Sequence, residues 1–217
     1  VVPMIASQDH KRIFDGDKGP NTGGMGTYAP APVLTDALRD EAMKTILAPM
    51  VAAMEKEGMP YVGCLYAGLM ITPQGPKVVE FNARFGDPET QVVLPLLDSD
   101  LGQIMMACAT GTLTADMVKW KDSSAACVIL ASKGYPETSS KGDVIHGDIK
   151  QHDTTIVFHS GTKLVGDEYV TNGGRVLGVV GLGKDLRTAL DRAYGRIEHI
   201  DFEGMQYRTD IGAKAFK

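Results

Sequence analysis

The chain has 217 residues, of which 43% are hydrophobic and 23% charged, and its mean hydropathy of −0.07 is typical of a globular protein. Its net charge of −5 excludes a general attraction to nucleic acid or to an anionic membrane, so neither is an expected partner. Any phosphate site must therefore be built locally, from Arg, Lys, metal ions or backbone N–H groups.

Compartment and redox state follow from simple features of the sequence. It contains no run of about 20 apolar residues, and we expect a cytoplasmic protein. The three cysteines, Cys64, Cys108 and Cys127, lack CxxC spacing and lie in apolar surroundings. We therefore expect them to be reduced, buried and chemically inert.

The first third of the chain predicts a strand, a long loop and a helix. Residues 1–6 are apolar enough for a strand, whereas residues 9–32 are polar and rich in Gly and Pro. Loops of that length are usually functional or disordered. Thr35 and Asp36 provide a cap for an amphipathic helix, which Gly58 ends.

A hairpin and two helices are expected next. Residues 61–72 and 77–82 predict strands joined by a turn at residues 74–75. Helices are expected over residues 91–97 and 100–110. This order of elements indicates the α+β class, with a mainly antiparallel sheet and accompanying helices.

The last part of the chain is predicted to be a small β-rich α+β domain. Asp185 caps a final helix with one apolar face. A polar stretch at residues 120–124 marks a change of composition, so we place a domain boundary near residue 121 and predict domains 1–121 and 122–217. The predicted strands cover residues 125–132, 142–147, 155–159, 169–171 and 174–181.

The most informative stretch is KVVEFNARFGDPETQ, residues 77–91. Side chains alternate along a strand, so Glu80, Asn82 and Arg84 are expected on one face. Glu80 and Asn82 offer hard oxygen ligands of the kind that suit Mg²⁺. Arg84 offers a planar fork for a phosphate or carboxylate. The alternative is the solvated face of an edge strand, with Arg84 and Asp87 as a surface ion pair.

The glycine-rich loop, residues 15–26 (DGDKGPNTGGMG), is a second candidate site. Its glycines can turn backbone N–H groups toward an anion, and Lys18 adds positive charge. It is neither a Walker A motif nor a dinucleotide-binding fingerprint, because no GK[ST] and no helix follow it. The preceding His10, Lys11 and Arg12 are either a basic cluster at the site or a solvated charge run.

Arg175 belongs to a third candidate. Asn172 and Gly173 predict a hairpin turn, which leaves Arg175 free to present its guanidinium group. Lys163 is a weaker companion. The remaining histidines show no ligand spacing, and the set is His146, His152, His159 and His199.

Taken together, these motifs resemble the C-terminal half of the phosphoribosylamine–glycine ligase family, purine-synthesis enzymes of the ATP-grasp superfamily. The resemblance covers essentially the whole chain. The motifs that carry it are SQDHKR at 7–12, DGDKGPNTGGMGTYAPAP at 15–32, RFGDPETQ at 84–91, GDVIHG at 142–147, SGTKL at 160–164 and TNGGRVL at 171–177.

The resemblance implies a fold and a missing part. Residues 1–121 would be the C-terminal part of an ATP-grasp domain, and residues 122–217 the β-rich C-terminal domain of the ligase. In the family, a substrate domain and an ATP-covering subdomain precede the position of Val1. We therefore expect a fragment that has little or no ligase activity without that N-terminal part.

The resemblance also implies a reaction. Glycine is joined to 5-phosphoribosylamine while ATP becomes ADP and phosphate, through glycyl phosphate and with Mg²⁺ or Mn²⁺. Glu80 and Asn82 are implied to bind the metal and, through it, the nucleotide phosphates. Arg84 would hold the transferring phosphoryl group, and Asp87 would orient the attacking amine or accept its proton.

The implied substrate contacts lie in the glycine-rich loop and at Arg175, which would face the 5′-phosphate. The loop residues are Asp17, Lys18, Asn21, Gly23 and Gly24.

Two other interpretations of the function of the chain remain open. One is a different ATP-grasp ligase, such as a carboxylase that uses bicarbonate, and the other is a non-catalytic phosphate-binding or assembly module.

Overall fold

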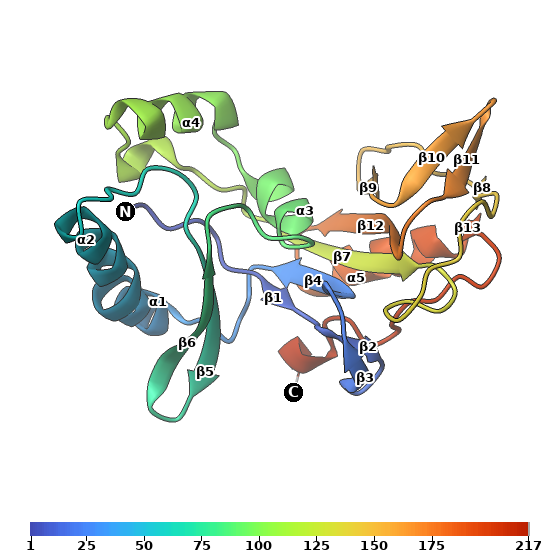
Figure 1. Cartoon of the computed structure of the whole chain (residues 1–217), viewed down its shortest axis with the longest axis horizontal. Coiled ribbons are helices and arrows are strands. Elements are labelled where there is room, and N and C mark those ends of the chain that lie inside the picture. The colour runs from blue at the N-terminus through green and yellow to red at the C-terminus, as the bar shows by residue number, and fades with distance from the viewer. Residues whose placement is uncertain (217) are drawn as a thin grey trace. The chain divides into compact units, whose positions relative to one another are not determined.

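A computed structural model describes residues 1–216, and they form two compact units that are each assembled from separate stretches of the chain (Figure 1). Both units combine helices with antiparallel strands, so the expected α+β class is confirmed. A unit boundary falls after residue 121, but the division into domains 1–121 and 122–217 stays a prediction. Unit 1 comprises residues 1–6, 31–86 and 97–121, and unit 2 comprises residues 7–30, 87–96 and those from 122 onward.

The helix expected after Thr35 is present in unit 1. It runs through α1 (Asp36–Ala42), a π-helical segment (Met43–Leu47) and α2 (Ala48–Lys56). The Thr35 hydroxyl accepts a hydrogen bond from the Leu38 N–H at 3.3 Å, so the predicted cap is confirmed. Gly58 follows with φ of +77° at the helix end.

Pro49 explains the π-helical segment. Proline has no N–H to donate to the carbonyl four residues before it, and its ring crowds that carbonyl. The preceding residue, Ala48, instead donates its N–H to the Met43 carbonyl, five residues back. The wider turn lets the helical run continue through a residue that would otherwise break it.

The predicted hairpin of unit 1 is confirmed. Strands β5 (Tyr66–Thr72) and β6 (Gly75–Asn82) pair antiparallel, from Thr72 opposite Gly75 at the turn to Tyr66 opposite Asn82. Strand β5 begins five residues later than residue 61, where the prediction placed it. The register shifts between the Gly68–Glu80 and Leu69–Val78 pairs, so Val79 forms a bulge.

Of the two later helices, one matches expectation and the other is shorter. Helix α4 (Leu101–Thr110) in unit 1 matches the prediction, with Asp100 as its cap and Gly111 in the left-handed conformation at its end. In unit 2, the expected helix over 91–97 is only α3 (Thr90–Val93), continued by a 3-10 helix (Leu94–Leu96). A short 3-10 helix (Ala115–Met117) completes unit 1. None of the described helices is long and apolar enough to cross a membrane.

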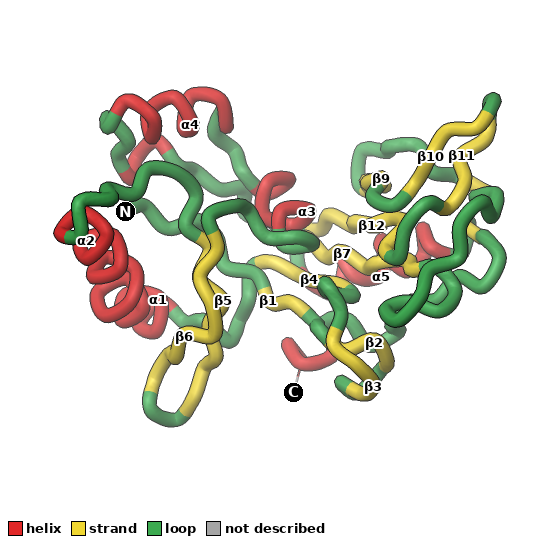
Figure 2. Tube along the Cα trace, in the orientation of Figure 1, coloured by secondary structure: helices red, strands yellow, loops and turns green. Residues whose placement is uncertain are grey.

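Unit 2 is built on a five-stranded antiparallel sheet with the order β1-β4-β7-β12-β9 (Figure 2). Strand β7 lies at its centre and is buried along its whole length. Helix α5 (Leu186–Ile197), capped by Asp185 as predicted, packs against β7 and β12. The strands are β1 (Gln8–Asp9), β4 (Gly26–Ala29), β7 (Ser124–Ala131), β9 (Thr155–His159) and β12 (Arg175–Gly183).

Three small ladders surround this sheet. Strands β2 (Arg12–Phe14) and β3 (Lys18–Asn21) pair within the region predicted as loop. The other two ladders pair β10 (Thr162–Val165) with β11 (Glu168–Thr171) and β8 (His146–Gly147) with β13 (Ile200–Asp201). A 3-10 helix (Ala213–Phe216) ends the described chain.

The core of unit 2 lies between the sheet and α5. Alternate residues of β7, namely Ala126, Val128 and Leu130, belong to one buried cluster with Ala193 and Ile197 of α5. Small residues on both surfaces allow a close approach of helix and sheet. A Cβ at Gly181 of β12 would lie 2.0 Å from the Ala189 carbonyl oxygen, so only glycine fits there.

Several predictions about strands are wrong. Residues 1–6 form no strand, and the Ala6 carbonyl accepts a hydrogen bond from the Ala31 N–H at 3.0 Å. Residues 9–32 are not a continuous loop, because β2, β3 and β4 lie within them. The expected strand over 142–147 is reduced to its last two residues. A strand requires a partner with free edge hydrogen-bonding groups, and short-range patterns do not report one.

The Asn172-Gly173 turn is also a wrong prediction. Strand β11, which precedes it, pairs with β10 rather than with β12. The Asn172 N–H instead donates to the Gly161 carbonyl at 2.7 Å.

All three cysteines are free, as expected, but only Cys127 is buried and the other two are partly exposed.

Candidate functional site

Strand β6 presents Glu80 and Asn82 near its end, in unit 1. They lie opposite Gly68 and Tyr66, and the bulge at Val79 comes before both. Regular alternation therefore holds between them, and their side chains share a face. A Cβ at Gly68 would lie 3.1 Å from the Glu80 Cγ, so the glycine leaves room for the Glu80 side chain.

This pair fits a hard divalent cation. Glu80 is exposed and Asn82 is partly buried, so a cation held by their oxygens would complete its coordination with water or phosphate oxygens. Within residues 1–216, no group of three or more His, Cys, Asp or Glu side chains could hold a metal ion. Asn82 also lines an apolar pocket in unit 1, together with Met50, Val51, Met54, Tyr61, Leu65, Phe81 and Ala83.

Arg84 does not share the face of Glu80 and Asn82 in the expected way. Strand β6 ends at Asn82, and Arg84 lies in a bend beyond it. Its Nη1 donates to the Phe85 carbonyl at 2.9 Å, and the side chain is exposed. The alternation argument therefore does not extend to Arg84, because it holds only while the backbone remains a strand.

In unit 2, Arg175 joins two of the sequence motifs. Its Nη2 donates to the Asp87 carboxylate at 2.9 Å, and its Nη1 donates to the backbone carbonyls of Asp87 and Gly23, each at 3.1 Å. The Gly23 N–H donates to the Tyr135 hydroxyl at 2.9 Å. Three predicted site residues, Gly23, Asp87 and Arg175, are thus brought into direct contact.

The two side chains of this ion pair differ in their exposure to solvent. The Arg175 side chain is 18% exposed and the Asp87 side chain 50%. The second oxygen of Asp87 accepts a hydrogen bond from the Gln91 side chain at 2.9 Å. Asp87 is therefore held in one orientation while half of its surface still faces solvent, which is the arrangement expected of a carboxylate that meets a ligand.

The glycine-rich loop passes close to Asp9. Gly24 has φ of +120°, and a Cβ there would lie 2.5 Å from the Pro88 Cδ and 2.8 Å from an Asp9 carboxylate oxygen. Burial raises the pKa of Asp9 to about 6, although the ion pair with Lys11 acts in the opposite direction. Glycine at position 24 is required both by the backbone conformation and by the close packing.

The loop does not form the expected anion nest at residues 22–25. The N–H groups of Thr22 and Met25 donate to the backbone carbonyls of Lys11 and His10. Those of Gly23 and Gly24 donate to the Tyr135 and Thr22 hydroxyls. All four donors are satisfied within the protein, so an anion would have to meet other groups of this loop.

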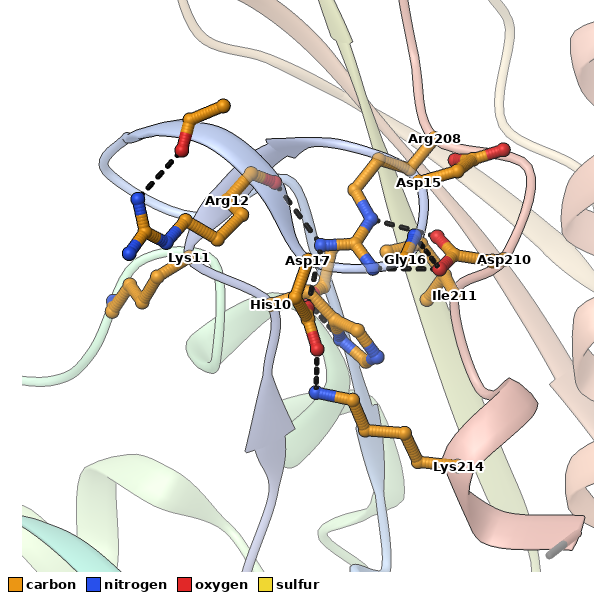
Figure 3. Close-up of polar contacts among 12 residues, drawn as sticks. His10, Lys11, Arg12, Asp15, Gly16, Asp17, Arg208, Asp210, Ile211 and Lys214 are labelled. Carbon is orange, nitrogen blue, oxygen red and sulfur yellow. Dashed lines mark hydrogen bonds and ion pairs between the residues drawn. The ribbon is translucent and has the colours of Figure 1, made fainter.

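The remaining predicted loop residues divide into two kinds. Lys18 and Asn21 lie on β3 and are exposed. Asp17 is engaged instead, since its carboxylate pairs with the Arg208 guanidinium at 3.0 Å and with the Lys214 ammonium at 2.5 Å (Figure 3). These bonds, with the Lys214 contact first, hold the pKa of Asp17 below its usual value.

Of the two interpretations left open for residues 10–12, the structure does not support a basic cluster. His10 is 1% exposed, its Nδ1 lies 3.1 Å from the Gly26 carbonyl, and burial lowers its pKa to about 4. Lys11 pairs with Asp9, and the Arg12 Nη1 donates to the Gly19 carbonyl at 2.6 Å. One member is neutral and the other two are engaged, so they do not form one cationic surface.

Sequence reasoning missed Tyr135, Arg208 and Asp210. Tyr135 follows β7 in a loop with no recognisable motif, and Arg208 and Asp210 lie near the C-terminal end of the chain. The alternation of Arg208 and Asp210 around Thr209 is a weak signal, because such pairs are common on surfaces. The burial of Arg208, and the partners of Arg208 and Asp210 near residue 16, are visible only in the structure.

Comparison with known proteins gives consistent matches along the chain. Residues 1–90 match the family described as phosphoribosylglycinamide synthetase, ATP-grasp (A) domain, and residues 125–214 match its C domain. The chain is 54% identical over 215 residues to a phosphoribosylamine–glycine ligase of Caulobacter vibrioides, covering 98% of this chain and 50% of that protein. The chain spans about half the length of the curated relatives it matches.

Comparison with solved structures gives the same family. The crystal structure of a phosphoribosylamine–glycine ligase from Thermotoga maritima superposes with a TM-score of 0.86 at 35% identity, over 97% of this chain and 52% of that one. The biotin carboxylase subunit of pyruvate carboxylase superposes with a TM-score of 0.63 at 14% identity, over 92% of this chain and 42% of that one. The second likeness concerns the fold alone.

Proposed function

Because the chain belongs to the phosphoribosylglycinamide synthetase family, we propose that it supplies the C-terminal part of an ATP-dependent ligase that joins glycine to 5-phosphoribosylamine. The reaction belongs to purine synthesis, and its small-molecule partners are ATP, glycine and the amine. A cytoplasmic location is part of the proposal. The observation that carries it is the bonding of Arg175 to both Asp87 and Gly23, since this unites residues from three family motifs.

Glu80 and Asn82 would hold the divalent cation, which we propose to be Mg²⁺ or Mn²⁺. When bound, such a cation neutralises charge on nucleotide phosphates. The space over Gly68 and the shared face of the two side chains support this assignment. The exposure of Glu80 also leaves its carboxylate accessible to a ligand from solvent.

The chain's own charged groups would then act on the reactants. The exposed Arg84 guanidinium would bind oxygens of the transferring phosphoryl group, where negative charge is spread over several atoms. Asp87 would orient the attacking amine of phosphoribosylamine or accept its proton. Arg175 supports that role because its Nη2 bonds to the Asp87 carboxylate while its Nη1 bonds to the Asp87 backbone carbonyl, and together these bonds hold the residue in one orientation.

The substrate contacts of the loop are proposed for Asp17, Lys18, Asn21, Gly23 and Gly24, with Arg175 near the 5′-phosphate. Lys18 and Asn21 are exposed and can meet a ligand directly. Asp17, Gly23 and Gly24 are more suited to shaping the loop, since their polar groups are bonded within the protein.

The test uses a chain extended by the N-terminal half that the curated relatives have. Formation of ADP and phosphate is measured with Mg²⁺ and ATP while glycine and phosphoribosylamine are supplied separately and together. We expect turnover only when both are present. Turnover that instead requires bicarbonate would contradict the proposal in favour of a carboxylase. Binding of neither nucleotide nor glycine in calorimetry would favour a non-catalytic module.

A further inference from the structure

A C-terminal segment, residues 208–214, bonds to the turn at residues 15–17 that opens the glycine-rich loop (Figure 3). Arg208 lies at the centre of this contact and is only 1% exposed. Its Nη1 donates to the Asp17 carboxylate at 3.0 Å and to the Arg12 carbonyl at 3.1 Å. The buried arginine therefore links the C-terminal segment to Asp17 of the turn and to Arg12 of β2, the strand that precedes the turn.

Asp210 connects Arg208 to the backbone of the same turn. The Arg208 Nε and Nη2 donate to the two Asp210 oxygens at 2.7 and 2.8 Å, a bidentate pair. One of these oxygens also accepts the Gly16 N–H at 2.8 Å. Burial opposes ionisation of Asp210, but the bonds from Arg208 and Gly16 outweigh it and hold its pKa far below the usual value.

Further bonds surround this pair. The Thr209 N–H donates to the Asp15 carboxylate at 2.9 Å, and the Thr209 hydroxyl donates to the other oxygen of Asp15. Lys214 binds the Asp17 carboxylate from the other side. Two cations therefore meet the carboxylates of Asp17 and Asp210, so that the buried charge is compensated.

The turn at residues 15–17 has an unfavourable backbone conformation that other interactions must stabilise. Gly16 has φ of +68° and Asp17 has φ of +55°. A non-glycine residue with positive φ is uncommon and energetically unfavourable. The bonds to both the backbone and the side chain of this turn supply the stabilisation, and they come almost entirely from the C-terminal segment.

The C-terminal segment is in turn attached to helix α5. The Tyr194 hydroxyl donates to the Arg208 carbonyl at 2.9 Å and accepts the Ile211 N–H at 3.0 Å. Ile211 is 2% exposed and belongs to the core cluster under α5. A continuous set of contacts thus runs from the core of unit 2 to the turn at residues 15–17.

We propose that Arg208 and Asp210 are positioning residues for substrate: by fixing the turn at residues 15–17, they set the placement of residues 18–26 and thereby the affinity for the phosphorylated amine. The identity of that substrate rests on the proposed function, whereas the fixing of the loop does not. The loop lies in the stretch that matches the ATP-grasp (A) domain, and its support lies in the stretch that matches the C domain.

The first measurement is hydrogen–deuterium exchange of residues 15–26 in the 217-residue chain. The variants are Arg208→Lys, which keeps the charge but loses the fork, and Asp210→Asn, which keeps the size. Arg192→Lys is the control, because Arg192 is an exposed arginine of α5 whose Nη1 bonds to the Leu182 carbonyl. We expect about tenfold faster exchange in the loop of both variants, with β7 and β12 unchanged.

The second measurement is steady-state kinetics of the same variants in the extended chain. We expect KM for phosphoribosylamine to rise about tenfold while kcat and the KM for ATP change less than about threefold, since positioning of one substrate affects its binding first. The Arg192→Lys variant should match the parent. A general structural role would instead lower the active fraction and hence kcat alone.

Three outcomes would overturn the proposal. They are unchanged loop exchange in either variant, faster exchange over the loop and the central strands alike in both, and faster loop exchange with an unchanged KM for phosphoribosylamine. If the extended parent chain lacks activity with glycine and phosphoribosylamine, the proposed function fails. The exchange experiment then still decides whether the C-terminal segment fixes the loop.

Discussion

The end of β6 and the turn at residues 15–17 carry predicted site residues in very different ways. Glu80 and Asn82 take their geometry from a hairpin whose paired residues are at most sixteen positions apart. The turn at residues 15–17 takes its geometry from bonds to residues more than 190 positions later, such as Gly16 to Asp210. A local hairpin therefore suffices for one half of the candidate chemistry, whereas the other half needs the complete unit 2.

The two regions also differ in burial, and this separates their expected effects. Glu80 is exposed and can be replaced without opening a cavity, so its loss should change activity and not stability. Arg208 is almost fully buried among charged partners, so its loss should change stability as well.

Replacing Glu80 by Ala in the extended chain should lower kcat at saturating Mg²⁺ by about a thousandfold or more, equivalent to about 4 kcal/mol. The free energy of unfolding should change by less than about 0.5 kcal/mol, because the side chain is exposed. Glu55→Ala, an exposed glutamate of α2, is the control for both assays. Unchanged activity in Glu80→Ala would remove Glu80 from the site.

Replacing Arg208 by Met should lower the free energy of unfolding by about 3 kcal/mol or more, because Asp17 and Asp210 lose their buried counter-charge. Urea unfolding measures this change. Arg39→Met is the matched control: Arg39 forms ion pairs with Asp36 and Asp40 but is 44% exposed, so its loss should cost less than about 1 kcal/mol. Equal costs for the two variants would contradict the importance of burial.

His10 predicts a loss of stability in mild acid. Burial lowers its pKa from 6.5 to about 4, so the stabilisation from neutral His10 is complete above pH 6.5 and is lost as the pH falls through about 4. The full loss corresponds to about 3 kcal/mol.

Titration of Asp9 affects the pH dependence of stability in the opposite direction to that of His10. Its pKa is raised from 3.8 to about 6, mainly by burial, so the stabilisation from its protonated form is present below pH 3.8 and is lost as the pH rises through about 6. Asp9→Asn should therefore show a steeper loss of stability than the parent between pH 6.5 and 4. Parallel pH profiles of the parent and Asp9→Asn in urea unfolding would show that Asp9 does not titrate as described, and a parent whose stability does not fall between pH 6.5 and 4 would show the same for His10.

Replacing Gly24 by Ala should cost about 2 kcal/mol, because residue 24 has φ of +120° and a Cβ would press against Pro88. Gly195→Ala in α5 is the control, since a Cβ there meets nothing within 4 Å. That change should stabilise the protein by up to about 1 kcal/mol through helix propensity. Thermal unfolding of both variants measures the difference, and a neutral Gly24→Ala would contradict the close packing of the loop.

Several elements could be predicted because their signals act over a few residues. Thr35 and Asp185 cap helices where expected, and a turn at residues 73–74, one residue before the predicted position, joins the expected strands. Each depends on a side chain that bonds within three residues or on a tight turn. The alternation that places Glu80 and Asn82 on one face is of the same kind.

Other features could not be predicted because they depend on distant partners. Residues 1–6 have the composition of a strand but form none, and Asn172-Gly173 has the composition of a hairpin turn but connects strands that do not pair with each other. Strand pairing is set by whichever edge is available in the folded chain. Residues 10–12 stayed open between a basic cluster and a solvated charge run for the same reason, since His10 is buried and its ring contacts the carbonyl of Gly26 in β4, sixteen positions later.

Residue chemistry and short-range periodicity were enough to recognise the family and the α+β class, and to predict that Glu80 and Asn82 bind a cation. Only the tertiary structure joined Arg175 to Asp87 and Gly23, made His10 neutral and enclosed Arg208 with Asp17 and Asp210. The difference arises from the sequence distance over which each interaction acts. Strand alternation and helix caps act between neighbours in sequence, whereas burial and charge compensation depend on segments that meet only when the chain has folded.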